Sequence, residues 1–241
     1  MTITIDDPWK ELRSECFGNV EPEIALEAVT VPLDNLTKPA QTRDFWNTIE
    51  TLPAWSAAIS YGSREKMADD MDRKKSLNKK LIDLGHMTPL ESLQFNFRVS
   101  GISKACGAQM SRHRIGQGHV SSSRRFQAQG AAFVYPLLSY IKEEQLARDA
   151  LNKLSEANKK AYEIYEDLRN SNKLHKEDAR RAIPVASSQE RIWWINARAL
   201  RDFLHLRLPR DAEWEIRRIA AMLYNIVMEV TPSLFEDIVV K

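Results

Sequence analysis

The amino-acid sequence predicts an α+β, or mixed α/β, domain with a central antiparallel sheet flanked by helices. Strand-like segments gather in the first half of the chain, and long amphipathic segments gather in the second half. Such segregation is typical of antiparallel sheets with helices packed against them. A chain of 241 residues is long enough to bury a sizeable core. We expect residues 1–241 to form one domain.

Short apolar or alternating segments mark the expected strands. Residues 1–42 contain scattered prolines and short apolar runs, such as 24–31, which fit one or two strands at a sheet edge. Residues 94–100 alternate between apolar and polar side chains, as a half-buried strand does. Residues 124–135 are expected to form a further strand that ends before Pro136.

Helical spacing marks most of the remaining segments. We expect helices over 43–56, broken at Pro53, and over 102–111, with an exposed helix or a loop over 66–84. The clearest helix spans about 142–168, where apolar residues recur every three to five positions. Its expected apolar stripe consists of Leu146, Leu151, Leu154, Ala157, Ala161, Ile164 and Leu168.

The last third of the chain is expected to be helical. A short helix opens at Lys176 and stops before Pro184, and a second spans Trp193 to Leu206. The final helix begins beyond Pro209. Its expected inner face carries Trp214, Ile219, Leu223, Ile226 and Val230.

Composition and charge limit the classes of function. Hydrophobic residues make up 43% and charged residues 28% of the chain, as in ordinary globular proteins. A net charge of +2 disfavours long nucleic acid as a partner. The N-terminus lacks a basic start followed by an apolar core, and no apolar run approaches the roughly 20 residues that cross a bilayer. We therefore expect a cytoplasmic protein with no membrane partner, whose cysteines, Cys16 and Cys106, are reduced.

One basic segment, residues 112–125, has the composition of a phosphate site. It mixes arginines and histidines with glycines and hydroxyls and contains no acidic residue. Guanidinium groups bind oxyanions through paired donors, and Gly116 and Gly118 let the backbone approach a ligand. The alternative is a solvated basic loop, or one that pairs with carboxylates elsewhere. Composition alone does not separate the two.

A second basic segment, residues 196–207, has helical spacing. This spacing places Arg198, His205 and either Arg201 or Asp202 on one flank. Polar groups close to bulky apolar ones often line a pocket. An ordinary amphipathic helix with Arg–Asp pairing is the alternative, and periodicity alone favours it. The expected packing side carries Trp193, Trp194, Leu200, Phe203 and Leu204.

Common metal and cofactor motifs are missing from the sequence. The five histidines form no HxxxH pair and have no carboxylate at metal spacing, so we expect no metal site. There is no P-loop, no GxSxG and no GxGxxG motif. A bound flavin would therefore not use the common dinucleotide fold.

Arg112-His113-Arg114, followed after seven residues by Ser122, forms an RHR-x7-S signature. In this signature, and in further segments between about residues 20 and 235, the chain resembles the flavin-dependent thymidylate synthases, the ThyX family. The further segments, in family order, are Ile59-Ser60-Tyr61-Gly62, Gly85-His86-Met87-Thr88-Pro89-Leu90-Glu91, Gln109, 177–184, 196–207 and 211–217.

The resemblance implies an activity, an assembly and a set of site residues. It implies a homotetramer with active sites between subunits, FAD as cofactor and NADPH as reductant. Methylenetetrahydrofolate would give its one-carbon group to C5 of a uridine nucleotide. Matching positions assign FAD contacts to Ser60, His86, Thr88, Arg112, His113, Arg114, His119, Asn196, Arg198, Asp202 and Asp211. They assign nucleotide contacts to Gln109, Arg112, Ser121, Ser122, Arg124, Arg180 and Arg207.

Two of these residues are candidates for a catalytic role. The resemblance places Arg207 near the uracil edge, where a cation stabilises negative charge that develops on the pyrimidine. Ser122 is a candidate nucleophile, but the sequence shows no histidine or lysine base at an evident spacing. We therefore expect Ser122 to bind substrate.

The chain departs from the family pattern inside the signature. Gln117, His119, Val120 and Arg125 stand where Ser, Asn, Glu and Tyr are usual. The change at Val120 is the largest, because it removes a carboxylate beside flavin and nucleotide and so favours an altered ligand. Three interpretations follow: a divergent dUMP methylase, an enzyme acting on UMP, and a homologue that binds flavin without turnover. We favour an active C5-methylase, similar to the ThyX relatives of polyoxin-type nucleoside antibiotic pathways.

Overall fold

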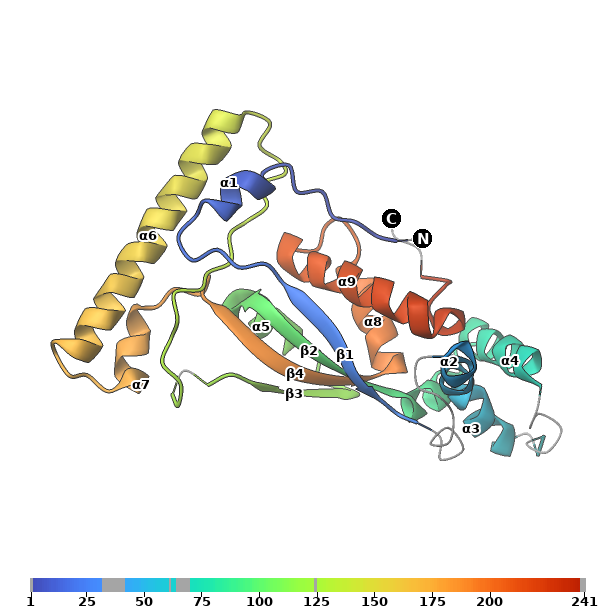
Figure 1. The fold of residues 1–241 in the computed structure, drawn as a ribbon. Helices are drawn as coiled ribbons and strands as arrows, with labels where there is room; N and C mark the ends of the chain where they lie inside the picture. The colour runs from blue at the N-terminus through green and yellow to red at the C-terminus, as the bar shows by residue number, and fades with distance from the viewer. Residues whose placement is uncertain (1, 32–41, 61, 64–69, 124, 239–241) are drawn as a thin grey trace.

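A four-stranded sheet forms the centre of the protein. The computed structural model describes residues 2–31, 42–60, 62–63, 70–123 and 125–238. Neighbouring strands are antiparallel throughout, which confirms the predicted sheet. In spatial order the strands are β1 (Glu23–Val29), β2 (Gln94–Ser103), β4 (Ser188–Asn196) and β3 (Gln117–Ser121) (Figure 1).

Helices lie at both ends of the sheet and across one face (Figure 1). The α-helices are α1 (Lys10–Ser14), α2 (Arg43–Glu50), α3 (Leu52–Ser60), α4 (Met71–Asp83), α5 (Lys104–Met110), α6 (Glu144–Asn170), α7 (Lys176–Ala179), α8 (Ala197–Arg207) and α9 (Trp214–Val230). Short 3-10 helices are η3 (Thr88–Ser92), η4 (Arg180–Ala182) and η5 (Pro232–Leu234). No helix of the described segments combines the length and apolar character needed to cross a membrane.

The main core lies between one face of the sheet and the helices α8 and α9. Strands β2 and β4 turn alternate residues toward this core, so Phe97 and Trp193 are fully buried. The Trp193 ring lies 6.4 Å from the Phe97 ring and 5.1 Å from the Phe203 ring of α8. Tilted and edge-on aromatic pairs at these distances stabilise a core beyond the area that they bury. The aromatic contacts therefore fix α8 on the sheet.

The predicted helix from Trp193 to Leu206 is wrong in its first part. Trp193 and Trp194 belong to β4, and α8 begins only at Ala197. The Oδ1 atom of Asn196 accepts the Ala199 N–H at 2.8 Å and caps the helix there. Aromatic residues pack well on a pleated surface, and pairing with both β2 and β3 extends this segment.

The predicted strand over 124–135 is also wrong. The strand lies earlier, at Gln117–Ser121, and the described residues that follow it form turns and coil. Phe133 makes only isolated bridges, and both Phe133 and Tyr135 are fully buried in a second small core beside α1 and α6. The apolar run therefore reflects burial and not strand pairing.

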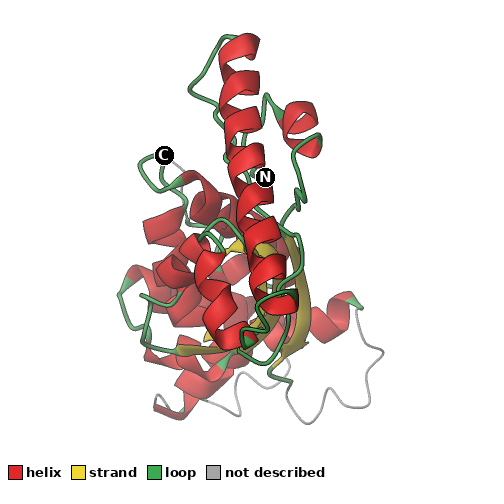
Figure 2. Cartoon of the chain, turned by 90° about the vertical axis from the view of Figure 1, so that its left-hand side faces the viewer, coloured by secondary structure: helices red, strands yellow, loops and turns green. Residues whose placement is uncertain are grey.

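The long helix α6 runs along one end of the molecule (Figure 1), and in the turned view its length reaches well past the sheet (Figure 2). Its existence confirms the predicted helix, but its apolar stripe is largely misplaced. The buried positions are Ala147, Leu151, Asn158 and Tyr165. Three members of the predicted stripe are exposed, namely Leu146 (55%), Leu154 (41%) and Ile164 (46%).

The helices α2, α3 and α4 follow the prediction with one shift. The break between α2 and α3 falls at Thr51, and Pro53 lies in the first turn of α3. A proline is tolerated there because the first N–H groups of a helix have no intrahelical partner. The helical alternative for 66–84 holds over the described range of α4, whereas 66–69 lie outside the described residues.

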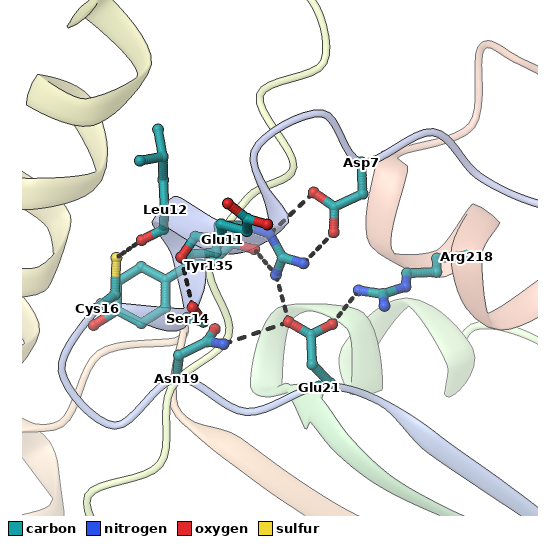
Figure 3. A network of polar contacts seen from close by, with 10 residues as sticks. Asp7, Glu11, Leu12, Ser14, Cys16, Asn19, Glu21, Tyr135 and Arg218 are labelled. Atoms are coloured by element: carbon teal, nitrogen blue, oxygen red, sulfur yellow. Dashed lines mark hydrogen bonds and ion pairs between the residues drawn. The ribbon is translucent and has the colours of Figure 1, made fainter. Parts of the chain in front are cut away.

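A network of ion pairs fastens the N-terminal segment to the sheet and to α9. Arg13 of α1 is 1% exposed and pairs with Asp7 and, at 2.9 Å, with Glu21. Glu21 also accepts from Arg218 of α9 at 2.7 Å. Asp7, Glu21 and Arg218 converge from three segments (Figure 3). Burial acts to raise the pKa of Glu21, but the two guanidinium groups outweigh it and hold that pKa below its ordinary value.

Candidate functional site

The basic segment after α5 lies alongside α8. At the C-terminal end of α8, Arg207 donates from Nε to Nε2 of His113 at 3.1 Å. The His113 ring meets the Phe203 ring edge-on at 4.8 Å. At the other end of α8, the Asn196 N–H donates to the Gly116 carbonyl at 2.8 Å. The two basic segments of the sequence are thus joined along one helix.

Gly116 permits this close approach. Its φ is +69°, and a Cβ at this position would lie 2.6 Å from Nδ2 of Asn196. Both the backbone conformation and the space therefore favour glycine. Asn196 in this way positions the segment that carries Arg112 and Arg114, both of which are exposed.

His113 is held as a hydrogen-bond acceptor. Burial, together with the neighbouring Arg207 guanidinium, lowers the pKa of His113, whereas Asp202 acts in the opposite direction. A neutral imidazole has one nitrogen that accepts a hydrogen bond, and Arg207 uses it. This bond uses only the Nε atom of Arg207, so it leaves the two Nη atoms to donate to a ligand.

Several predicted flavin contacts lie near the N-terminal end of α8. Arg198 pairs through Nη1 with Glu91 of η3 at 2.7 Å, and η3 begins at Thr88. The helix α3, which ends at Ser60, packs on η3. His86 precedes η3 and is exposed. The structure therefore brings this group of polar side chains to one end of the sheet.

Other predicted flavin contacts lie outside this group at the N-terminal end of α8. Asp202 is exposed on α8, and Asp211 is exposed in the loop between α8 and α9. His119 lies on β3 with Nε2 at 3.4 Å from Oγ of Ser111. Arg201 belongs to the core and not to the polar flank, because it is 2% exposed and holds Asp237 with both Nη atoms.

A cationic groove gathers predicted nucleotide contacts at the far end of β3. It has a volume of about 510 Å³. Its described lining contains only cations and hydroxyls: Lys104, Ser121, Ser122, Ser123, Arg180 and Arg181. The backbone N–H of Ser122 donates to the Glu190 carbonyl at 2.9 Å. The Oγ atom of Ser122 accepts the Glu190 N–H at 3.3 Å. Arg124 lies outside the described residues.

The contacts of Ser122 bear on its predicted roles. Among the described residues, the hydrogen-bond partner of Ser122 Oγ is a backbone N–H. A nucleophilic serine instead needs a general base within hydrogen-bond reach of its hydroxyl. This environment supports substrate binding.

Gln109 and Arg207 are not among the described lining residues of the groove. Gln109 donates from Nε2 to Glu213 at 3.3 Å, and Glu213 in turn caps α9. No hydrogen bond or ion pair between described residues joins Gln109 or Arg207 to Ser122 or Arg180. The contacts of Gln109 and Arg207 are therefore made with other residues than those of the groove.

Val120 lies on the opposite face of β3 from His119 and Ser121. It is 65% exposed and pairs with Ile192 of β4. Next to it, Gly118 pairs with Trp194, whose ring would lie 2.6 Å from a Cβ at the glycine. The departure at Val120 thus falls on the face of the sheet turned away from α8 and α9, whereas those at Gln117 and His119 fall on the other face.

Sequence reasoning missed several polar residues around the groove. Lys104 and Arg181 line it, and Arg191 lies buried on β4 beside it. The spacing of Gln189, Arg191, Trp193 and Ile195 at every second position indicates a buried strand position for Arg191, but not a function. The helical prediction over Trp193 concealed this alternation.

Comparison with known proteins identifies the family of the chain. Residues 43–233 match the family model Thy1, described as thymidylate synthase complementing protein. Three curated relatives, each named flavin-dependent thymidylate synthase, come from Geobacter sulfurreducens, Wolinella succinogenes and Thermosipho africanus.

The similarity to these relatives extends over most of each chain. The Geobacter protein is 31% identical over 195 residues, which cover 78% of this chain and 81% of the relative. The Wolinella protein is 33% identical over 187 residues, covering 73% and 84%. The Thermosipho protein is 30% identical over 192 residues, covering 75% and 82%. The matched residues include α8 with its basic neighbour and the serines of the groove, and the chain belongs to the flavin-dependent thymidylate synthase family.

Proposed function

We propose that this protein is an FAD-dependent enzyme that methylates C5 of a uridine nucleotide. Methylenetetrahydrofolate is the carbon donor and NADPH is the reductant. The observation that carries the proposal is the alignment of the 112–116 segment along α8, with Arg207 held by His113. Relatives of the chain are named flavin-dependent thymidylate synthases, which supports the same chemistry.

The residues present fit a flavin dinucleotide. Arg112, Arg114 and Arg198 are exposed, and guanidinium groups bind a pyrophosphate through paired donors. Thr88 of η3 and Ser60 of α3, two elements that pack together, add hydroxyls, and His86 adds a ring nitrogen. We infer that these groups hold FAD, which when bound supplies the hydride that completes the methyl group.

The groove holds the phosphate of the nucleotide in this proposal. Ser121, Ser122 and Arg180 provide hydroxyl and guanidinium donors, and no carboxylate among the described lining residues opposes an anion there. Fixing the phosphate orients the pyrimidine ring for attack at C5. Ser122 therefore acts by positioning substrate, and its hydroxyl takes no part in bond formation.

Arg207 is the catalytic cation of the proposal. Its guanidinium is fixed by His113 before substrate arrives, so little reorganisation is needed when negative charge develops on the pyrimidine. A neutral His113 is required, because a protonated ring has no nitrogen left to accept from Nε. The pair His113–Arg207 thus combines charge with fixed orientation.

We further propose a homotetramer with active sites between subunits. The groove lining contains Ser121, Ser122 and Arg180 but neither Arg207 nor Gln109, and this supports a nucleotide site completed by a second copy. A second copy would bring the two halves of the nucleotide site together. Analytical ultracentrifugation tests the assembly, and a sedimenting monomer that turns over substrate would overturn it.

The nucleotide is UMP, dUMP or both. Loss of a carboxylate at Val120 removes a hydrogen-bond acceptor, and this supports a ligand that differs from the family's usual one. Parallel assays with UMP and dUMP, read by the mass of the product, test the choice. Methylated UMP supports the broader specificity, and strict preference for dUMP contradicts it.

The enzymatic proposal itself is tested on purified protein. A yellow protein that contains near-stoichiometric flavin, is bleached by NADPH and forms a methylated nucleotide supports it. Arg207→Ala is expected to abolish turnover while Arg210→Ala, an exposed neighbour outside the site, retains it. A colourless protein that takes up no FAD would instead be a non-catalytic homologue.

A further inference from the structure

Arg191 is a buried cation that has no counter-ion among the described residues. Its side chain projects from β4 toward the core side of the sheet and is 3% exposed. Within the described residues, its Nε and Nη1 atoms have no hydrogen-bond partner, and no ion pair includes it. An unpaired charge in such a position destabilises the folded chain unless another group neutralises it.

The fold makes room for this guanidinium. A Cβ at Gly107 of α5 would lie 2.3 Å from Nη2 of Arg191 and 1.6 Å from Nε2 of Gln189. Any larger residue at 107 would therefore displace both side chains. Burial lowers the pKa of Arg191, but a guanidinium stays protonated at ordinary pH. The protein thus encloses a permanent positive charge.

The neighbours of Arg191 connect it to the cationic groove. Ser121 lies directly opposite Arg191 in the β3–β4 pairing, and directly opposed Cβ atoms are about 4.5–5.5 Å apart. Ser121 lines the groove, and its Oγ is a second buried atom that has no partner among the described residues. Lys104, also in the lining, bonds to Gln189 at 3.2 Å.

These orphaned donors share one requirement. The Arg191 guanidinium and the Ser121 hydroxyl would both be satisfied by an oxyanion, whose charge the cations of the lining would also favour. A phosphate dianion offers enough acceptor oxygens for Arg191 and Ser121 together. A carboxylate from another copy of the chain would also neutralise Arg191, but it would leave the remaining donors of the groove unused.

We propose that Arg191, which is buried behind the groove lining and directly opposite Ser121, binds the phosphate group of the nucleotide substrate together with Ser121. The identity of that nucleotide rests on the proposed function; the oxyanion site itself does not. Arg191 is thereby a specificity-determining residue, which selects a phosphorylated ligand over the corresponding nucleoside.

A role in ligand binding and a role in folding make opposite predictions for Arg191→Met. Removing an uncompensated buried charge stabilises the ligand-free protein, and we expect its Tm to rise by roughly 2–8 °C. The same change removes charge-assisted hydrogen bonds to the ligand, so dUMP should bind roughly 10- to 100-fold more weakly. Arg191→Lys keeps a cation and should retain part of the affinity.

The experiment uses the full-length flavin-containing protein with three probes: dUMP, deoxyuridine and inorganic phosphate. Calorimetry gives each affinity, and thermal unfolding gives each Tm with and without probe. We expect Arg191→Met and Ser121→Ala to weaken dUMP and phosphate binding and to leave deoxyuridine binding unchanged. Arg98→Leu is the matched control, because Arg98 lies on the adjacent strand, pairs with Ile192 and is exposed on the other face.

Three results would overturn the inference. A lower Tm of ligand-free Arg191→Met with unchanged dUMP affinity would show a structural role. Equal losses for dUMP and deoxyuridine would separate Arg191 from the phosphate. A change of oligomeric mass with no change in phosphate binding would assign its counter-ion to another copy. If the wild-type protein turns over no uridine nucleotide, the proposed function fails, and the inorganic phosphate arm still decides on Arg191.

Discussion

Arg207 donates its Nε hydrogen to Nε2 of His113 across 3.1 Å, and this bond joins the last turn of α8 to the segment that follows α5. The His113 ring is also fixed by Phe203, so the guanidinium is oriented by a residue that is itself held in the core. The cation that we assign to catalysis is therefore preorganised in the folded chain.

This bond should make activity and stability depend on the protonation of His113. Its pKa is lowered on folding, so between the folded and unfolded values the unfolded chain binds the proton more readily. The stability that the folded chain gains from neutral His113 is fully present above about pH 6.5. It is lost as the pH falls from there through the lower pKa that His113 has in the folded chain. Denaturant unfolding and kcat, measured from pH 5 to 8, should both fall on the acid side. His113→Gln, which keeps an acceptor but does not titrate, should lose this dependence; an unchanged profile would contradict the assignment.

Glu215 should give a pH dependence of the opposite sign. Burial raises its pKa to about 7, against the hydrogen bonds from the Ser103 N–H and Oγ at 2.6 and 2.5 Å. The folded chain holds the Glu215 proton more tightly than the unfolded chain does. The stability gained from this protonated carboxyl is therefore fully present below pH 4.5 and is lost as the pH rises through about 7. The whole change is about 3 kcal/mol. Comparing the free energy of unfolding of wild type and Glu215→Gln across this range checks it, and parallel curves would refute it.

The Arg13 network should contribute substantially to stability. Removing one partner of a buried ion pair leaves the other charge uncompensated, so Arg13→Ala should lower the free energy of unfolding by roughly 3–5 kcal/mol. Arg148 provides the control, because its ion pair with Glu144 is exposed and screened by solvent, so Arg148→Ala should change the free energy of unfolding far less than Arg13→Ala does. Urea unfolding measures both; equal effects would show that the Arg13 network behaves like a surface pair.

Gly116 should be required for flavin retention. Gly116→Ala places a Cβ 2.6 Å from Asn196 in a backbone of φ +69°, and the left-handed conformation alone costs roughly 1–2 kcal/mol. We expect a displaced 112–116 segment and less FAD per protein, read from flavin absorbance. A Cβ at Gly130 meets nothing within 4 Å, so Gly130→Ala should keep its flavin. Full flavin content in both variants would argue against the positioning role.

The sequence predicts the antiparallel sheet and the order of most helices because their patterns are local. The alternation of Phe95, Phe97 and Val99 is enough to identify β2. The assignment of Trp193 fails for a non-local reason, since a short apolar run fits a helix as well as a strand until its partners are known. Its partners, Phe97 and His119, lie about 100 and 74 positions earlier in the chain.

In the candidate site, too, local sequence motifs can be predicted and contacts between distant residues cannot. The motif residues of α8 and the preceding basic segment are recognisable by resemblance, and the structure joins them through Arg207–His113. The buried Arg191 carries no local signal of function. Its importance depends on Ser121, which pairs with it from β3, and on Gly107 of α5. Both residues are distant from Arg191 in the sequence, so only the folded structure shows these contacts.

The alternation along β3 has an evolutionary consequence. Val120 and Ser121 are neighbours in sequence, but one faces the open side of the sheet and the other faces the groove beside Arg191. A substitution at 120 therefore leaves the hydroxyl at 121 in place and disturbs little of the core. A single substitution can change the surface at Val120 while it keeps the phosphate contact that we propose for Ser121, and this gives new ligand preferences a short mutational path.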